Sequence, residues 1–203
     1  EYDYLIVGAG MVGLSIAHQL IIHDPNKKIC VIEKENEVGS HSSGRNSGVL
    51  HAGIYYEPQT LKSHLCIEGS KRLNKWCKEQ NIKILECGKV ISPQDLNLDF
   101  QLDNLLERGK KNGAVVEIIN QNKFDELVPN GRTSSGRALW SPNTSVVSPL
   151  QVIRKLYEKL ISEGIDFLFN TKLVKYDSAE QVVISKNNLD SINYKIKFRH
   201  LFN

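Results

Sequence analysis

The chain has 203 residues, of which 40% are hydrophobic and 24% are charged, as is ordinary for a globular protein with a substantial buried core. The net charge of +3 comes from basic residues spread along the chain, so no basic stripe favours nucleic acid as a partner. No apolar run approaches the roughly 18 residues of a membrane span, and we expect neither a transmembrane segment nor a secretory signal.

The first unit predicted along the chain is a strand, a glycine-rich turn, a helix and a second strand. Tyr4–Val7 is an apolar run typical of a strand buried on both faces. Apolar residues then recur at helical spacing over 14–21, Pro25 stands in the following turn, and 28–34 read as the second strand. The two strands of such a βαβ unit must lie parallel.

The turn of this unit carries the pattern G-x-G-x-x-G at Gly8, Gly10 and Gly13. The first glycine turns the chain, the second lets the backbone approach a pyrophosphate, and the third lets helix and strand pack closely. The N–H groups of the helix N-terminus would face the phosphates. Glu33 ends the second strand, where a carboxylate can accept from both ribose hydroxyls. The pattern predicts dinucleotide binding; the alternative is a glycine turn that packs on the sheet without a ligand.

The middle of the chain predicts a helix over 61–81 and then a smaller mixed region. One face of the helix carries Leu61, Leu65, Gly69, Leu73 and Trp76 or Cys77, and Gly69 on that face predicts the close approach of another backbone. Short strands over 82–92, 114–119 and 137–140 and a helix over 98–113 follow, with turn residues between them. We therefore expect 82–147 to form an inserted α+β lobe.

The last part of the chain returns to helix and strand. Ser148 and Pro149 suit a helix start, Gly164 suits its end, and 165–169 read as a buried strand. Three antiparallel strands are predicted at 172–177, 181–186 and 193–203. The predicted domains are thus a first domain made of 1–81 and 148–203, with 82–147 inserted into it.

The four cysteines, Cys30, Cys66, Cys77 and Cys87, show no C-x-x-C spacing. Three of them stand among apolar neighbours in predicted regular structure. We expect reduced thiols rather than disulfides or a zinc site, and no metal is predicted. Reduced thiols favour a reducing compartment, so the expected location is cytoplasmic.

The segment HSSGRNSGVLHAGIYY, at 41–56, is unusually rich in small and polar residues. Together with VGAGMVGLSIAHQL, VIEKE, LKSHLCIEGS, Gly88-Lys89 and ALWSPNTSVVSPLQV, it resembles the L-2-hydroxyglutarate oxidase/dehydrogenases, of the D-amino-acid-oxidase-like FAD-dependent oxidoreductases. The resemblance runs along almost the whole chain. It implies an α/β fold: a Rossmann-like FAD-binding domain, with a parallel sheet and an antiparallel three-strand meander, and an inserted α+β substrate lobe.

The resemblance also implies FAD as cofactor and assigns residues to it. The glycine turn would hold the pyrophosphate, Glu33 the adenosine ribose, and the backbone of Val174 the adenine. The segment 42–46 would run beside the pyrophosphate and ribityl chain, and Ser47 and Gly48 near the isoalloxazine ring. The complete predicted set is Gly8, Gly10, Gly13, Glu33, Lys34, Ser42, Ser43, Arg45, Asn46, Ser47, Gly48 and Val174. The alternative is a solvated loop rich in turn formers.

The predicted catalytic residues are His51, Tyr55 and Tyr56. Oxidation of a hydroxy acid removes a hydride from C2 and a proton from its hydroxyl, and a neutral imidazole can take that proton near pH 7. His51 could instead fix the loop, and for the two tyrosines packing is the favoured interpretation.

Three further side chains are considered for the site on their chemistry alone. Arg132 and Arg137 could clamp a distal carboxylate, since a guanidinium fork suits that geometry, but solvated turn arginines are favoured. His64 is assigned to packing or the helix surface.

The family implies oxidation of an L-2-hydroxy acid, L-2-hydroxyglutarate to 2-oxoglutarate, with hydride transfer to the flavin N5. Oxygen or a membrane quinone would be the later electron acceptor, which adds a peripheral position at the inner membrane as an option. The family pattern continues beyond the last strand, so both domains are expected to be incomplete here and activity of this piece is in doubt. The alternatives are another oxidoreductase of the superfamily, acting on an amino acid or glycerol 3-phosphate, or a non-catalytic FAD-binding fragment.

Overall fold

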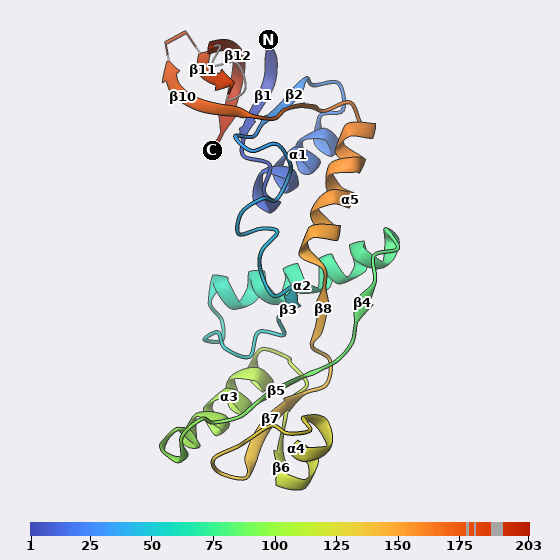
Figure 1. The fold of residues 1–203 in the computed structure, drawn as a ribbon, viewed down its shortest axis with the longest axis vertical. Helices are drawn as coiled ribbons and strands as arrows, with labels where there is room; N and C mark the ends of the chain where they lie inside the picture. The colour runs from blue at the N-terminus through green and yellow to red at the C-terminus, as the bar shows by residue number, and fades with distance from the viewer. Residues whose placement is uncertain (178, 181, 188–192) are drawn as a thin grey trace. The chain divides into compact units, whose positions relative to one another are not determined.

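The computed structural model describes residues 1–177, 179–180, 182–187 and 193–203 (Figure 1). Contacts divide the chain into two units, Glu1–Asn46 with Pro149–Asn203, and Ser47–Ser148. The predicted domains instead place 47–81 with the FAD-binding part. The contacts group 47–81 with the inserted region, and their assignment to FAD binding stays a prediction.

The first unit contains a six-stranded sheet in the order β10-β11-β12-β1-β2-β9. Its strands are β1 (Tyr2–Val7), β2 (Ile29–Ile32), β9 (Asp166–Leu168), β10 (Thr171–Asp177), β11 (Val182–Asn187) and β12 (Asn193–Phe202). β12, β1, β2 and β9 pair in parallel, while β10, β11 and β12 pair antiparallel. The predicted parallel sheet with a three-strand meander is confirmed. Gln181, the predicted first residue of the middle meander strand, lies outside the described residues.

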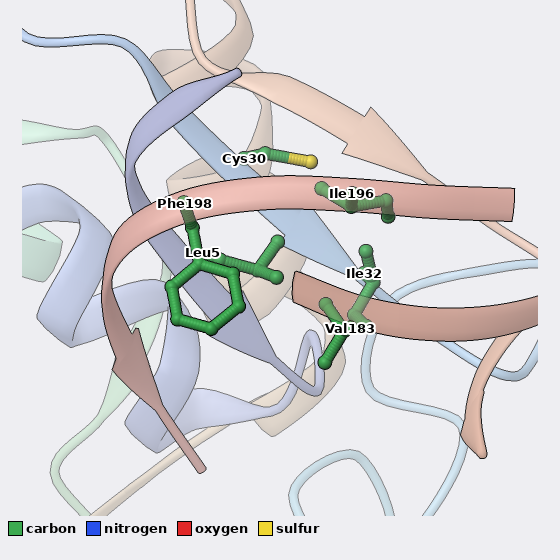
Figure 2. Packing of buried hydrophobic residues seen from close by; sticks show 6 residues of the cluster. All are labelled: Leu5, Cys30, Ile32, Val183, Ile196 and Phe198. Carbon is green, nitrogen blue, oxygen red and sulfur yellow. The ribbon is translucent and has the colours of Figure 1, made fainter. Parts of the chain in front are cut away.

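The core of this sheet joins its parallel and antiparallel parts. Leu5 of β1 and Ile32 of β2 pack with Val183 of β11 and with Ile196 and Phe198 of β12 (Figure 2). All four residues of β2 are buried, as its continuous apolar sequence requires. The ends of β1 and β2 that carry the glycine turn and Glu33 are therefore held by a rigid core.

Two helices belong to the same unit, α1 (Met11–His23) and α5 (Pro149–Ser162), and they pack against each other. The buried face of α5 consists of Val152, Ile153, Leu156 and Leu160, as its apolar spacing predicts. Gly164 has a φ of +85° just after α5, a conformation that glycine adopts without strain.

The second unit contains two three-stranded antiparallel sheets and four helical segments. The sheets have the orders β3-β8-β4 and β5-β7-β6. The strands are β3 (Val49–Leu50), β4 (Ile84–Leu85), β5 (Lys89–Ile91), β6 (Glu117–Asn120), β7 (Arg137–Ser141) and β8 (Ser145–Val147). The helical segments are α2 (Leu61–Glu79), η1 (Leu96–Leu98), α3 (Phe100–Lys111) and α4 (Gln121–Leu127). The predicted α+β character is confirmed.

The predicted buried face of α2 is wrong over the first half of the helix and right at Cys77. Leu61 and Leu65 are 72% and 59% exposed, whereas the buried residues of the helix are Ser63, off the predicted face, and Cys77, on it. A Cβ atom added at Gly69 would meet nothing within 4 Å, so no backbone approaches it closely. The apolar spacing of α2 therefore does not by itself decide which of its residues pack inward.

All four cysteines are free; Cys30 and Cys77 are buried, Cys66 is partly buried and Cys87 is exposed. Burial raises the pKa of the Cys30 thiol to about 12, so it stays protonated and unreactive.

In the described part of the chain, no helix is long and apolar enough to cross a membrane. The same residues contain no group of three His, Cys, Asp or Glu side chains that could hold a metal ion.

Candidate functional site

The glycine turn between β1 and α1 uses each glycine for a different reason. Gly8 has a φ of +99°, which a residue with a side chain rarely adopts, and its N–H donates to the carbonyl of Ile32 at 2.8 Å. A Cβ atom at Gly13 would lie 2.0 Å from the carbonyl oxygen of Gly8, so only glycine lets α1 begin this close to the turn. The backbone geometry is that expected of a dinucleotide turn.

The N-terminus of α1 lies against the segment that follows β2. Gly10 is the N-cap and provides no side-chain cap, while the N–H of Met11 donates to Oγ of Ser43 at 3.1 Å. A Cβ atom at Gly10 would stand 3.0 Å from that Oγ. The positive end of the helix dipole is thus next to the predicted phosphate-binding segment, and Gly10 and Ser43 lie together, while their contacts with a cofactor stay a prediction.

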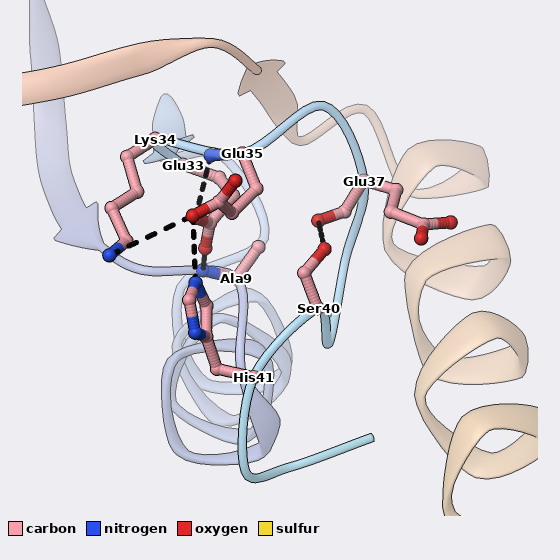
Figure 3. Close-up of polar contacts among 7 residues, drawn as sticks. All are labelled: Ala9, Glu33, Lys34, Glu35, Glu37, Ser40 and His41. Carbon is pink, nitrogen blue, oxygen red and sulfur yellow. Dashed lines mark hydrogen bonds and ion pairs between the residues drawn. The ribbon is translucent and has the colours of Figure 1, made fainter. Parts of the chain in front are cut away.

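Glu33 stands at the end of β2 with only 9% of its surface exposed. One carboxylate oxygen accepts from the N–H of Ala9, in the glycine turn, at 2.7 Å, and the other accepts from the N–H of Glu35 at 3.0 Å (Figure 3). A carboxylate can accept about four hydrogen bonds. Two backbone donors orient Glu33 and leave capacity for two hydroxyl donors, which fits the vicinal hydroxyls of a ribose.

The residues after Glu33 form a polar cluster that the sequence interpretation missed, apart from Lys34. Nε2 of His41 lies 2.7 Å from Oε1 of Glu35, and Nζ of Lys34 lies 3.7 Å from the same oxygen (Figure 3). The hydrogen bond from His41 holds the pKa of Glu35 below its usual value. The N–H of Gly39 donates to the carbonyl of Ala9 at 3.1 Å, so the segment folds back onto the glycine turn.

The segment 42–46 is a tight turn whose own side chains close it. Nδ2 of Asn46 donates to the carbonyls of Ser42 and Ser43 at 3.2 and 2.9 Å. A Cβ atom at Gly44 would lie 2.2 Å from the carbonyl oxygen of Gly39. Ser42, Arg45 and Asn46 are exposed. The amide of Asn46 therefore orders the turn, and contacts of these residues with a cofactor stay a prediction.

Val174 lies in β10, where the pairing with β11 is interrupted. Leu173 pairs with Ser185 and Lys175 with Ile184, so Val174 has no partner residue in the ladder. Its side chain is 59% exposed. The strand begins beside Glu33, because the N–H of Thr171 donates to the carbonyl of Glu33 at 2.8 Å. A backbone left outside the ladder is suited to pair with the edge of a base.

The remaining predicted site residues, Ser47, Gly48, His51, Tyr55 and Tyr56, belong to the second unit. The ring centroids of His51 and Tyr55 lie 6.4 Å apart in an edge-on arrangement. Nζ of Lys89 stands 4.4 Å from the centroid of Tyr55, and Nζ of Lys62 stands 4.9 Å from that of Tyr56. The structure therefore groups His51 and Tyr55 with a lysine that sequence reasoning did not assign to the site.

The imidazole of His51 is half-buried and carries no carboxylate partner among the described residues. Burial, and secondarily the positive charge of Lys89, holds the pKa of His51 below the ordinary histidine value. Both effects disfavour the imidazolium form. A neutral ring with a free lone pair is the form that can accept a proton.

The tyrosine turn that follows His51 is held by α3. Nδ2 of Asn112 donates to the carbonyls of Gly53 and Tyr56, both at 2.8 Å. Gly53 has a φ of +84°, and a Cβ atom there would lie 2.9 Å from Ile67. Tyr55 remains 41% exposed. The backbone is fixed while the phenol of Tyr55 stays accessible.

The two arginines considered as a carboxylate clamp are placed elsewhere. Arg137 pairs with Asp99 and Asp103 at the start of α3, so its guanidinium is engaged by the protein's own carboxylates. Arg132 is exposed, as is His64 on α2. Arg137 is thus not the solvated turn residue that was favoured, since it lies in β7 and its guanidinium is ion-paired within the protein.

A parallel sheet with a glycine turn, an acidic residue ending β2 and an antiparallel meander defines a dinucleotide-binding domain of the flavoenzyme type. The residues fit such a group: Gly10 and Gly13 leave no room for side chains, and Glu33 retains free acceptor sites. Residues 3–196 match the family model of FAD dependent oxidoreductases, and the chain belongs to this family. The predicted cofactor, FAD, is confirmed at the level of the family.

Curated relatives include L-2-hydroxyglutarate dehydrogenases. A mitochondrial one from Nematostella vectensis is 42% identical over 154 residues, which are 75% of this chain and 33% of the relative. One from Caenorhabditis briggsae, also mitochondrial, is 36% identical over 198 residues, which are 97% of this chain and 43% of the relative. The chain thus spans less than half the length of these relatives, and the resemblance to this group is confirmed.

Solved structures share the fold at low identity. The dithionite-reduced L-alpha-glycerophosphate oxidase from Mycoplasma pneumoniae, with FAD bound, superimposes with a TM-score of 0.82 at 19% identity. The match covers 98% of this chain and 53% of that protein. At this identity the likeness concerns the fold alone.

Proposed function

We propose that the chain contributes the FAD-binding portion and part of the substrate lobe of an enzyme that oxidises L-2-hydroxyglutarate to 2-oxoglutarate. The observation that carries the proposal is the buried Glu33 carboxylate, fixed by the amide of Ala9 at 2.7 Å beside the glycine turn. The similarity to L-2-hydroxyglutarate dehydrogenases supports this substrate over an amino acid or glycerol 3-phosphate.

The cofactor would be held mainly by backbone. Gly8 and Gly10 present backbone without side chains at the N-terminus of α1, where a pyrophosphate would lie, and Gly13 lets the helix begin close to the turn. Ser43 lies beside this N-terminus. Glu33 would accept from the ribose hydroxyls, and the backbone of Val174 would meet the adenine. When bound, FAD supplies the acceptor for the hydride leaving C2 of the substrate.

His51 would accept the proton of the substrate hydroxyl. Its neutral imidazole is suited to this, since burial and Lys89 both disfavour the charged form. Tyr55, with its phenol accessible, could donate a hydrogen bond to the substrate, whereas the backbone of Tyr56 is tied to α3. Loss of the hydroxyl proton to His51 and of the C2 hydride to the flavin would convert the hydroxy acid into the 2-oxo acid.

The electron acceptor and location are further parts of the proposal. Oxygen or a membrane quinone would reoxidise the flavin, with the enzyme peripheral at an inner membrane. The names of both relatives include the word mitochondrial, which supports this location more than a cytoplasmic one.

The test is the absorbance of the purified chain after addition of FAD and removal of free cofactor. We expect flavin bands that bleach when L-2-hydroxyglutarate is added without oxygen, and that persist with glycerol 3-phosphate or amino acids. His51→Ala should keep the bands and slow the bleaching about a hundredfold or more. Flavin bands that resist every hydroxy acid would favour the second candidate function, a non-catalytic FAD-binding fragment. The observation that favours this candidate is that the matched region is 33% of the length of the relative.

A further inference from the structure

Two side chains of the second unit, His51 and Lys89, lie beside the phenol ring of Tyr55. His51 follows β3, Tyr55 lies in the next turn, and Lys89 is the first residue of β5. The ammonium of Lys89 stands 4.4 Å from the phenol centroid and the imidazole centroid of His51 lies 6.4 Å from it. A cation and a proton acceptor thus share one aromatic neighbour.

The charge of Lys89 is not neutralised by the carboxylates nearest to the cluster in sequence. Glu57, two residues after Tyr55, pairs with Arg108 at 3.1 Å. Glu86, three residues before Lys89, pairs with Lys78 at 3.7 Å. Within the part of the chain that the structure describes, Lys89 takes part in no ion pair with a carboxylate. Lys89 is a partly buried residue whose ammonium, among the described residues, contacts the face of Tyr55 and forms no ion pair, so it can bind a further anion.

The position of Lys89 is imposed by the residue before it. Gly88 has a φ of +67°, and its N–H donates to the carbonyl of Thr144 at 2.8 Å. A Cβ atom at Gly88 would lie 1.9 Å from the indole of Trp140, so the ring covers the glycine directly. Lys89 then pairs with Ser141 in the ladder between β5 and β7. The backbone of Lys89 is therefore fixed by Gly88 and by the ladder, and its ammonium lies over the ring of Tyr55.

We propose that Lys89 binds a carboxylate of the hydroxy acid whose hydroxyl faces His51, and so sets the requirement for an acid as substrate. This inference rests on the proposed function. The carboxylate of a 2-hydroxy acid is attached to the carbon that bears the hydroxyl, so a cation close to the base is where that carboxylate would lie. An N⁺–H···O⁻ contact is about twice as strong as a neutral hydrogen bond and would orient the substrate.

The coupling between Lys89 and His51 provides a readout that needs no turnover. The positive charge of Lys89 contributes to the low pKa of His51, so a carboxylate bound to Lys89 should raise that pKa. The experiment follows the imidazole of His51 by NMR across pH, with and without glutarate, a dicarboxylate with no hydroxyl to oxidise. Pentane-1,5-diol, which has the same length without charge, controls for the carbon chain.

Lys89→Met is compared with Lys62→Met, which removes the corresponding contact with Tyr56. We expect Lys89→Met to weaken glutarate binding about tenfold to a hundredfold, as for loss of one charged hydrogen bond, and to raise the pKa of His51 without ligand. Lys62→Met should bind glutarate like the wild type. Equal effects of the two variants, or absence of glutarate binding in the wild type, would overturn the assignment.

Measurements on the same samples distinguish a failure of this inference from a failure of the proposed function. If L-2-hydroxyglutarate fails to bleach the flavin while glutarate still binds through Lys89, the oxidation proposal fails and the anion-binding role of Lys89 remains. If the flavin is bleached and Lys89→Met changes neither glutarate binding nor the Michaelis constant, the oxidation stands and the role of Lys89 is refuted.

Discussion

The main-chain amide of Ala9 donates a 2.7 Å hydrogen bond to the buried carboxylate of Glu33. This contact joins the glycine turn after β1 to the end of β2, 24 residues further along the chain. It orients an acceptor at the place where a dinucleotide of this fold needs one.

Glu33→Gln should weaken FAD binding and destabilise the first unit. An amide has one acceptor oxygen, so the N–H of Ala9 or that of Glu35 would face an NH₂ group. We expect a loss of about 1–3 kcal/mol in the free energy of unfolding and a rise in the FAD dissociation constant of at least tenfold. Urea denaturation measures the free energy of unfolding, and a fluorescence titration measures the FAD dissociation constant. Glu37→Gln, at a side chain 58% exposed, should change neither, and equal effects at both positions would contradict the assigned role.

Gly13→Ala should disrupt the turn. The added Cβ would lie 2.0 Å from the carbonyl oxygen of Gly8, and backbone cannot move aside without displacing α1. We expect the free energy of unfolding to fall by about 3 kcal/mol or more. Urea denaturation monitored by circular dichroism measures this change. Gly69→Ala is the matched control, since nothing lies within 4 Å of its added methyl group in α2. That substitution should be neutral or stabilise by about 1 kcal/mol, because alanine favours helix. A tolerated Gly13→Ala would contradict the close packing of α1.

Gly88→Ala should damage the start of β5 through a clash as well as through backbone strain. Its Cβ would meet the indole of Trp140 at 1.9 Å, at a φ of +67°. Gly113 has a similar φ of +76°, and a Cβ atom added there would meet nothing within 4 Å. Gly113→Ala therefore measures backbone strain alone, which we expect to cost about 1–2 kcal/mol. We expect Gly88→Ala to cost clearly more than this in thermal unfolding. If the two variants melt alike, the contact between Gly88 and Trp140 does not hold Lys89 in place.

The stability of the chain should fall as pH falls through the ordinary histidine pKa. The pKa of His51 is lower in the folded chain, so the unfolded state binds its proton first. The contribution of His51 is complete above the ordinary value and is lost as pH drops toward the folded pKa. Burial lowers the pKa of His18 in the same direction. The difference between the wild type and His51→Gln therefore isolates His51.

The measurement is urea denaturation at a series of pH values. His51→Gln should show a shallower decrease in the free energy of unfolding than the wild type below the ordinary histidine pKa. Identical slopes for the two proteins would show that His51 is as solvated in the folded chain as in the unfolded one, and would remove the basis for its neutral form.

Short-range patterns predicted much of the first unit. The apolar runs, the glycine turn and the helix ends at Pro149 and Gly164 are local features, and local sterics decide them. The helix α4 was not predicted, because the predicted strand ended at Ile119, residues 120–124 were assigned to no element and the residues from Asp125 on were read as turns. In the structure, the side chain of Asn120 accepts a hydrogen bond from the N–H of Lys123 at 3.0 Å and caps α4.

The sequence by itself determined the class of fold and the binding of a dinucleotide, since strand, glycines, helix and Glu33 follow one another within a single βαβ unit. FAD in particular was implied by the resemblance to the family, which segment 41–56 carries most specifically. Only the tertiary structure decided which face of α2 is buried, that Arg137 pairs with Asp99 and Asp103, and that Lys89 stands over Tyr55 near His51. Those contacts join residues dozens of positions apart. No periodicity encodes them, because they depend on how separate strands and helices pack in space.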